Sequence, residues 1–150
     1  MRIKIIPPLV MLFFAGAMYV LAQFLPVGQF DFFGRRELAI GLLGLAVLVM
    51  ALALFQFKKV KTTTNPIDLS KTSSLVTHGI FKYSRNPMYL AMLLILLAFG
   101  LKLSNAFNTL VAAGFVYYMN HFQIRFEEEA LEKKYGKVYS IYKKNTRRWF

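Results

Sequence analysis

Two polar stretches contain most of the side chains that could do chemistry, and apolar segments separate them. The first runs from Asn65 to Tyr89. The second begins after Asn120 and contains three adjacent carboxylates, Glu127–Glu129. Carboxylates beside an apolar helix are costly unless they meet water, cations or a ligand. The two stretches are therefore candidate halves of one binding or catalytic site.

The pair Asn86-Pro87 predicts the start of a helix in the first stretch. Asn is a favoured N-cap residue, and Pro is a favoured first helical residue. The free N–H groups and positive dipole end of such a helix could receive a carboxylate or phosphate. The alternative is a plain helix start, with the Arg85 side chain reaching towards lipid headgroups.

In the second stretch, Glu127 and Glu128 lie ~100° apart on a helix, so one of them can point inward while the other is solvated. Further along, apolar and aromatic residues recur at helical spacing between lysines, at Leu131, Tyr135, Val138 and Tyr142. This pattern predicts a basic amphipathic helix, broken or bent near Gly136, that lies along a membrane surface. We expect its tyrosines to pack rather than to catalyse.

Four apolar segments must position these stretches, and they are Ile5–Leu25, Leu38–Phe57, Asn86–Leu101 and Leu103–Ile124. A helix needs ~20 residues to cross ~30 Å of hydrocarbon, and only the third segment is short. A tight turn at 100–105 would pair the third and fourth segments as a hairpin and bring both polar stretches to one membrane face. The predicted fold class is all-α: a polytopic membrane protein with about four transmembrane helices, a helical hairpin and an amphipathic C-terminal helix.

Composition excludes several kinds of site. The chain is 57% hydrophobic and lacks cysteine, which excludes disulfides, thiolate zinc sites and cysteine nucleophiles. His78 and His121 lie far apart and give no metal-ligand spacing, so we expect no metal. Neither a P-loop nor a dinucleotide glycine motif occurs. We attribute the net charge of +12 to anionic lipid headgroups and membrane orientation, and expect no nucleic-acid partner.

The distribution of Lys and Arg predicts the orientation. Sixteen of the 19 lie in the N-terminal segment, the central loop or the tail, and three lie in the two loops on the other side. The positive-inside rule then places both termini and the amphipathic helix on the cytoplasmic side. We expect an integral protein of a prokaryotic inner membrane. A signal peptide is the alternative for the first segment, which is long for one and is followed by a second span.

The polar stretches resemble a known family. Leu75–Phe81 followed by Arg85–Tyr89 resembles the "LVTxGxY…RHPxY" signature of isoprenylcysteine carboxyl methyltransferases and their bacterial relatives, and Thr64–Pro66 resembles the "TxxNP" of bacterial members. The tail resembles the "EExxL…FGxxYxxY" motif of that family, at Glu127, Glu128, Leu131, Tyr135, Gly136, Tyr139 and Tyr142. The resemblance covers roughly residues 60 to 150.

The resemblance implies one membrane-embedded domain over residues 1–150, with two spans in 1–57 and a cofactor-binding half in 58–150. It implies methyl transfer from S-adenosylmethionine to a lipophilic acceptor at the cytoplasmic membrane face. The cofactor contacts carried over are Leu75, Val76, His78, Phe81, Asn86, Pro87, Met88, Tyr89, Glu127 and Glu128. Aromatic rings suit adenine or a sulfonium, and a carboxylate suits the cofactor amine or ribose.

The resemblance further implies that Arg85 and Glu127 are catalytic and that Gln123 and Arg125 contact the acceptor. The sequence departs from the family pattern, because Asn86 replaces a His, Phe81 replaces a Tyr, and Gln123 stands where the eukaryotic enzymes carry an Arg. The acceptor therefore stays open among a prenylcysteine-like carboxylate, a phospholipid amine and another small amphiphile. The alternatives are an NADPH-dependent membrane reductase of related fold and a non-catalytic lipid-binding or scaffold protein. The oligomeric state stays open too.

Overall fold

A computed structural model describes residues 6–25, 27–59 and 74–150, and these residues form helices and connecting turns without any strand. The α-helices are α1 (Pro7–Phe24), α2 (Arg35–Lys59), α3 (Pro87–Leu103), α4 (Asn108–Tyr118), α5 (Arg125–Tyr135) and α6 (Lys137–Asn145). A 3-10 helix, Gly79–Lys82, precedes α3, and a π-helix, Met119–Ile124, joins α4 to α5. The Thr64–Pro66 motif lies outside the described residues.

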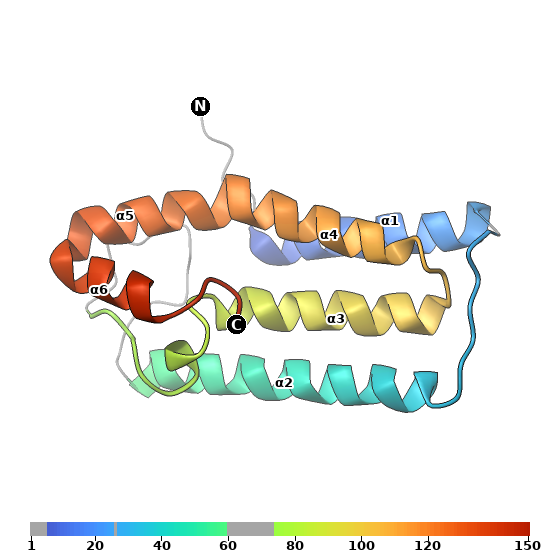
Figure 1. The fold of residues 1–150 in the computed structure, drawn as a ribbon, viewed down its shortest axis with the longest axis horizontal. Coiled ribbons are helices and arrows are strands. Elements are labelled where there is room, and N and C mark those ends of the chain that lie inside the picture. Colours follow the sequence, from blue (N-terminus) through green and yellow to red (C-terminus); the bar gives the residue numbers. More distant parts are fainter. Residues whose placement is uncertain (1–5, 26, 60–73) are drawn as a thin grey trace.

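Helices α1 to α4 lie side by side and alternate in direction, with α3 in contact with α1, α2 and α4 (Figure 1). The core between them is apolar: Met18, Leu96 and Phe115 are fully buried in it. As a result, the starts of α1 and α3 and the end of α2 lie at the end of the bundle where α5 and α6 are found (Figure 1). We call this the basic end.

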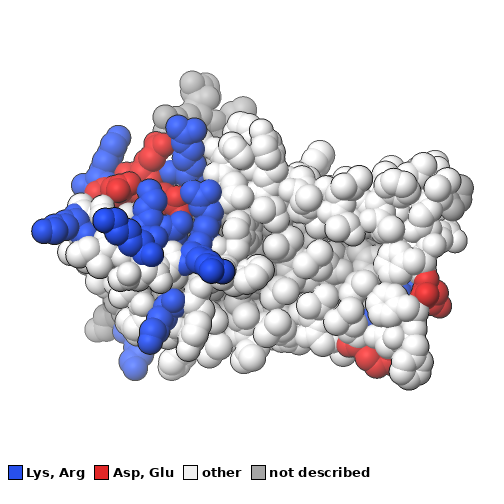
Figure 2. Space-filling model, viewed as in Figure 1, with Lys and Arg blue, Asp and Glu red and all other residues white. Residues whose placement is uncertain are grey.

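The outer surface of the bundle is apolar between two charged ends. Charged side chains on the face in Figure 2 gather at the basic end and, in smaller number, at the opposite end, with an uncharged belt between them. Large apolar residues of α1 and α2 are exposed, including Phe13 at 72% and Phe55 at 65% exposure. Such a surface is unusual in a water-soluble monomer. Helices α1, of 18 residues, and α2, of 25, are long and apolar enough to cross a membrane.

The hairpin turn lies later in the chain than the sequence predicted. Helix α3 continues through Gly100 to Leu103, and α4 begins at Asn108, so the turn spans 104–107 and overlaps the predicted 100–105 at Ser104 and Asn105 alone. Ser104 takes a left-handed conformation with φ of 58° and ends the helix. The Arg35 guanidinium donates to the Leu101 carbonyl at 2.6 Å and to the Ser104 hydroxyl, which satisfies the last turn of α3 from a distant helix.

The predicted C-terminal helix is two helices rather than one. Gly136, with φ of 53°, ends α5, and α6 folds back beneath it towards α3 (Figure 1). The break near Gly136 follows the prediction. Tyr139 and Tyr142 are buried on the inner face of α6, while Val138 is exposed. The tyrosines therefore pack against the rest of the protein, as expected.

Substitution of Gly28 tests the contact between the loop that follows α1 and Phe107 in the hairpin turn. Its φ is +79°, and a Cβ at this position would lie 2.7 Å from the Phe107 ring. We expect Gly28→Ala to lower the free energy of unfolding by about 1–3 kcal/mol, measured by thermal unfolding in detergent, because both the backbone and the ring are strained. Gly41→Ala is the control, since nothing lies within 4 Å of that position in α2. Equal stability of the two variants would contradict this account.

Candidate functional site

A cavity of about 260 Å³ opens at the basic end, where segments distant in the sequence meet. Its walls come from the start of α1, the end of α2, the segment before α3, the first turns of α3, and the facing sides of α5 and α6. The lining residues are Ile6, Pro7, Pro8, Phe57, Ser74, Leu75, Val76, Phe81, Arg85, Asn86, Pro87, Met88, Tyr89, Met92, Glu127, Glu128, Leu131, Tyr135, Tyr139 and Tyr142. This volume is slightly below the usual range for small-molecule sites.

The structure brings most of the candidate residues from both polar stretches to this cavity. Among the cofactor-binding and catalytic candidates, one residue is an exception: His78 is exposed and does not line the cavity. Of the two acceptor candidates, Gln123 lies beside the lining residue Glu127 and donates to it. Arg125 is on another face of α5, where its side chain is 67% exposed and pairs with Glu129.

The 3-10 helix forms one wall by holding Phe81 inward. Gly79 begins this helix with φ of +64°, a conformation that residues other than glycine rarely adopt. Phe81 is 5% exposed and packs edge-on against Phe57 at the end of α2. The Tyr142 hydroxyl donates to the Phe81 carbonyl at 2.6 Å, so this wall is held against α6.

The start of α3 forms the neighbouring wall. Asn86 is the N-cap residue and Pro87 the first helical residue, as the sequence predicted. The Asn86 side chain makes no capping hydrogen bond. Instead, its amide donates to the Arg148 carbonyl at 3.0 Å, which joins the helix start to the C-terminal segment. Asn86, Pro87, Met88 and Tyr89 all line the cavity, so the positive end of the α3 dipole faces it.

Glu127 lies in a nearly apolar setting with neutral partners. The Tyr89 hydroxyl and the Gln123 amide both donate to its Oε1 atom, at 2.6 and 2.5 Å. Burial raises the pKa of the Glu127 carboxyl to about 7, and the nearby Glu128 charge adds to the rise, although the two hydrogen bonds oppose it. A carboxyl group that titrates near neutral pH can bind a cation or exchange a proton.

Glu128 is in a different electrostatic setting, because two arginines neutralise it. Its carboxylate is 3.0 Å from Nη2 of Arg85 and 2.6 Å from Nη2 of Arg148. The Arg85 side chain is itself 9% exposed, and its Nε–H group is buried without a hydrogen-bond partner in the part of the chain that the structure describes. Arg85 lines the cavity, so its positive charge lies beside the space that a ligand would fill.

The π-helix sets which residues face the cavity. Its six residues, Met119–Ile124, interrupt one continuous helical path from α4 into α5. A π-turn inserts an extra residue, so the following residues are rotated relative to an ideal α-helix, and such insertions are frequent at functional sites. Here Glu127 and Glu128 both line the cavity, although adjacent residues of a helix lie ~100° apart.

Sequence reasoning missed part of the lining. Ile6, Pro8, Phe57 and Met92 are apolar residues at helix ends or within spans, and nothing in their local sequence distinguishes a cavity wall from a lipid-facing surface. Tyr142 was expected to pack, and it does so while also lining the cavity beside Tyr139. Among the described residues, no group of three or more His, Cys, Asp or Glu side chains could hold a metal ion.

Comparison with known proteins assigns this arrangement to a family. The family model described as phospholipid methyltransferase matches residues 34–138, well over half of the chain. An uncharacterized protein of Haemophilus influenzae is 48% identical over 62 residues, which cover 41% of this chain and 98% of that protein. No solved structure matches.

The described residues form a helical membrane protein with a cavity at one end of its helix bundle. This chain belongs to the phospholipid methyltransferase family, which lies in the same membrane methyltransferase superfamily as the isoprenylcysteine carboxyl methyltransferases. Members of the family are methyltransferases, and methyl transfer to a lipid-like acceptor is the activity that membership indicates.

The raised pKa of Glu127 predicts a pH-dependent stability. Between its ordinary value near 4.5 and about 7, the folded state holds a proton that the unfolded state releases, so the free energy of unfolding falls as pH rises. We expect a loss of about 3 kcal/mol from pH 4 to 8 from this group, absent in Glu127→Gln. Thermal unfolding of both proteins in detergent across this range measures it. Identical pH profiles would show that Glu127 ionises normally.

Proposed function

We propose that this protein transfers a methyl group from S-adenosylmethionine to a lipophilic acceptor, with a phospholipid amine as the favoured acceptor class. The observation that carries the proposal is Glu127, a carboxylate beside the α3 helix start in an aromatic-lined cavity, with a pKa raised by burial to about 7. The family description supports methyl transfer to a lipid.

The cavity residues suit the charged parts of this cofactor. Glu127 has only neutral hydrogen-bond donors as partners, so its negative charge can meet the cofactor's amine or sulfonium. The positive charge of Arg85, which lines the cavity, and the positive end of α3 can attract its carboxylate. Phe81 and Tyr135 are aromatic residues of the cavity lining that can contact the adenine ring.

The chain's own residues would orient the acceptor, exclude water and accept a proton. S-adenosylmethionine supplies an electrophilic methyl group when bound. The apolar walls exclude water and hold the acceptor in line with that group. A protonated amine must lose a proton before it can attack, and Glu127, with a pKa near 7, is the group placed to accept it. A carboxylate acceptor would need no base.

We further propose that four helical segments cross the membrane, with the basic end in the cytoplasm. These segments are α1, α2, α3, and α4 together with the π-helix that continues it. The alternating direction of the four helices, the uncharged belt and the excess of Lys and Arg at one end support this arrangement. The cofactor would then enter from the cytosol. The acceptor would enter beside the start of α1, where Pro7 and Pro8 line the cavity next to the apolar belt.

Calorimetry on the detergent-purified protein tests the cofactor assignment. We expect saturable binding of S-adenosylmethionine and no binding of NADPH. Glu127→Ala should abolish the binding without unfolding the protein, because the cofactor's cationic groups lose their counter-charge. Glu129→Ala is the matched control, since that carboxylate is exposed and pairs with Arg125.

Unchanged binding in Glu127→Ala would overturn the role of this residue. Binding of NADPH in place of S-adenosylmethionine would favour a reductase. Binding of neither ligand, by a protein shown to be folded, would favour a lipid-binding or scaffold protein.

The absence of cysteine permits a clean test of the membrane arrangement. We expect single cysteines placed at Lys102 and Lys144, which are both exposed, to react with membrane-impermeant maleimide from opposite sides of the membrane. In intact cells or spheroplasts only the Lys102 position should react, and in inverted vesicles only the Lys144 position. Labelling of both from one side would contradict four crossings.

A further inference from the structure

The C-terminal segment Thr146–Trp149, which we call the C-terminal strap, lies against the wall of the cavity without lining it. Its backbone binds the residues that precede α3: the Arg147 carbonyl accepts from the Arg85 N–H at 3.0 Å, and the Arg148 carbonyl accepts from the Asn86 side chain at 3.0 Å. The strap follows the segment that the family model matches, which ends at residue 138.

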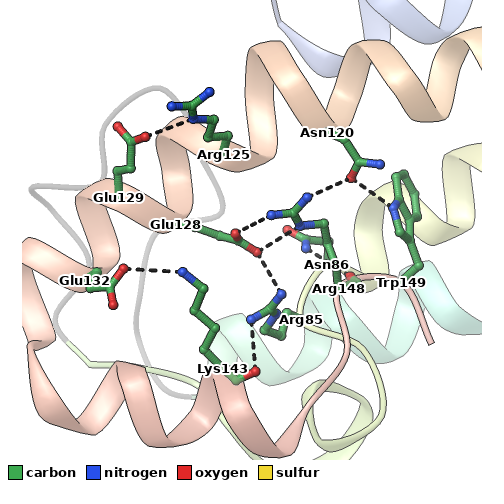
Figure 3. Close-up of polar contacts among 10 residues, drawn as sticks. All are labelled: Arg85, Asn86, Asn120, Arg125, Glu128, Glu129, Glu132, Lys143, Arg148 and Trp149. Carbon is green, nitrogen blue, oxygen red and sulfur yellow. Dashed lines mark hydrogen bonds and ion pairs between the residues drawn. The ribbon is translucent and has the colours of Figure 1, made fainter.

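Arg148 fastens this strap to the helix on the other side of the cavity. Its guanidinium meets both oxygens of Glu128, with Nε 3.1 Å from Oε1 and Nη2 2.6 Å from Oε2 (Figure 3). Its Nη1 donates to the Asn120 side chain at 3.4 Å, and Asn120 also accepts from the Trp149 indole at 3.1 Å. Two-pronged contact of this kind fixes direction as well as distance.

Glu128 links Arg148 to the cavity residue Arg85. The carboxylate is 5% exposed, and each arginine supplies one unit of positive charge to it. Hydrogen bonding to Glu128 also raises the pKa of Arg148, so the Arg148 guanidinium stays charged. Loss of Arg148 would leave Arg85 as the single arginine that neutralises the buried Glu128 carboxylate. It would also detach the strap from α5, so Arg85 and Asn86 would no longer be held in place.

We propose that Arg148 is a positioning residue: through Glu128 and the strap it holds Arg85 and Asn86 in the geometry that binds the anionic end of the cofactor. This inference rests on the proposed function. In it Glu128 is the internal counter-ion of two arginines rather than a direct cofactor ligand, because its carboxylate is already occupied by both of them. Glu127 remains the carboxylate that meets the ligand.

Calorimetric titration of S-adenosylmethionine into Arg148→Gln and Arg147→Gln tests the role. The two variants remove the same charge from adjacent positions, but the Arg147 side chain is exposed. We expect Arg148→Gln to raise the dissociation constant by about tenfold at an unchanged number of sites per protein, because the ligand contacts are displaced. Arg147→Gln should bind within about twofold of the wild type. A merely structural role would instead lower the number of sites at an unchanged dissociation constant.

Arg148→Lys keeps the charge and covers the case in which Arg148→Gln does not fold. A lysine can make one ion pair with Glu128 but not the fork, so we expect affinity between the wild type and Arg148→Gln, with Arg147→Lys as its control. Equal dissociation constants for the position-148 and position-147 variants would overturn the positioning role alone. Failure of the folded wild type to bind S-adenosylmethionine would overturn the proposed function and this inference together.

Discussion

The carboxylate of Glu128 is buried at the basic end of the bundle, where an uncompensated charge would cost several kcal/mol. Two guanidinium groups compensate it, one just before α3 and one in the C-terminal strap. Because these groups come from parts of the chain more than 60 residues apart, neutralising one side chain fixes three segments relative to one another. The cavity lies between those segments, so its shape depends on this cluster.

The adjacent carboxylates Glu127 and Glu128 have different environments because a helix rotates by ~100° per residue. Glu128 points to the arginines and is fully paired. Glu127 points to Tyr89 and Gln123, which donate hydrogen bonds but carry no charge. One carboxylate is thus used to hold the structure together, and the other keeps its charge available, which is the division of roles that the proposed chemistry requires.

Sequence patterns predicted the helical elements well where local physics determines them. The start of α3 follows from the Asn86-Pro87 pair, and the break between α5 and α6 follows from Gly136. The hairpin turn was misplaced because Arg35, from another helix, satisfies the carbonyls that extend α3 to Leu103. Arg125 was expected near the acceptor, but it lies on the outer face of α5, just after the π-helix, and is exposed.

By itself the sequence predicted the helices of the described residues, two polar stretches at one end of them, and most candidate residues that line the cavity, since helix period, capping and apolar length are local properties. Only the tertiary structure decided that His78 lies outside the cavity, that Phe57 and Met92 line it, and that Arg148 binds Glu128. These contacts depend on the path of the chain between elements. A basic residue in a basic tail looks the same in sequence whether it faces water or a buried carboxylate.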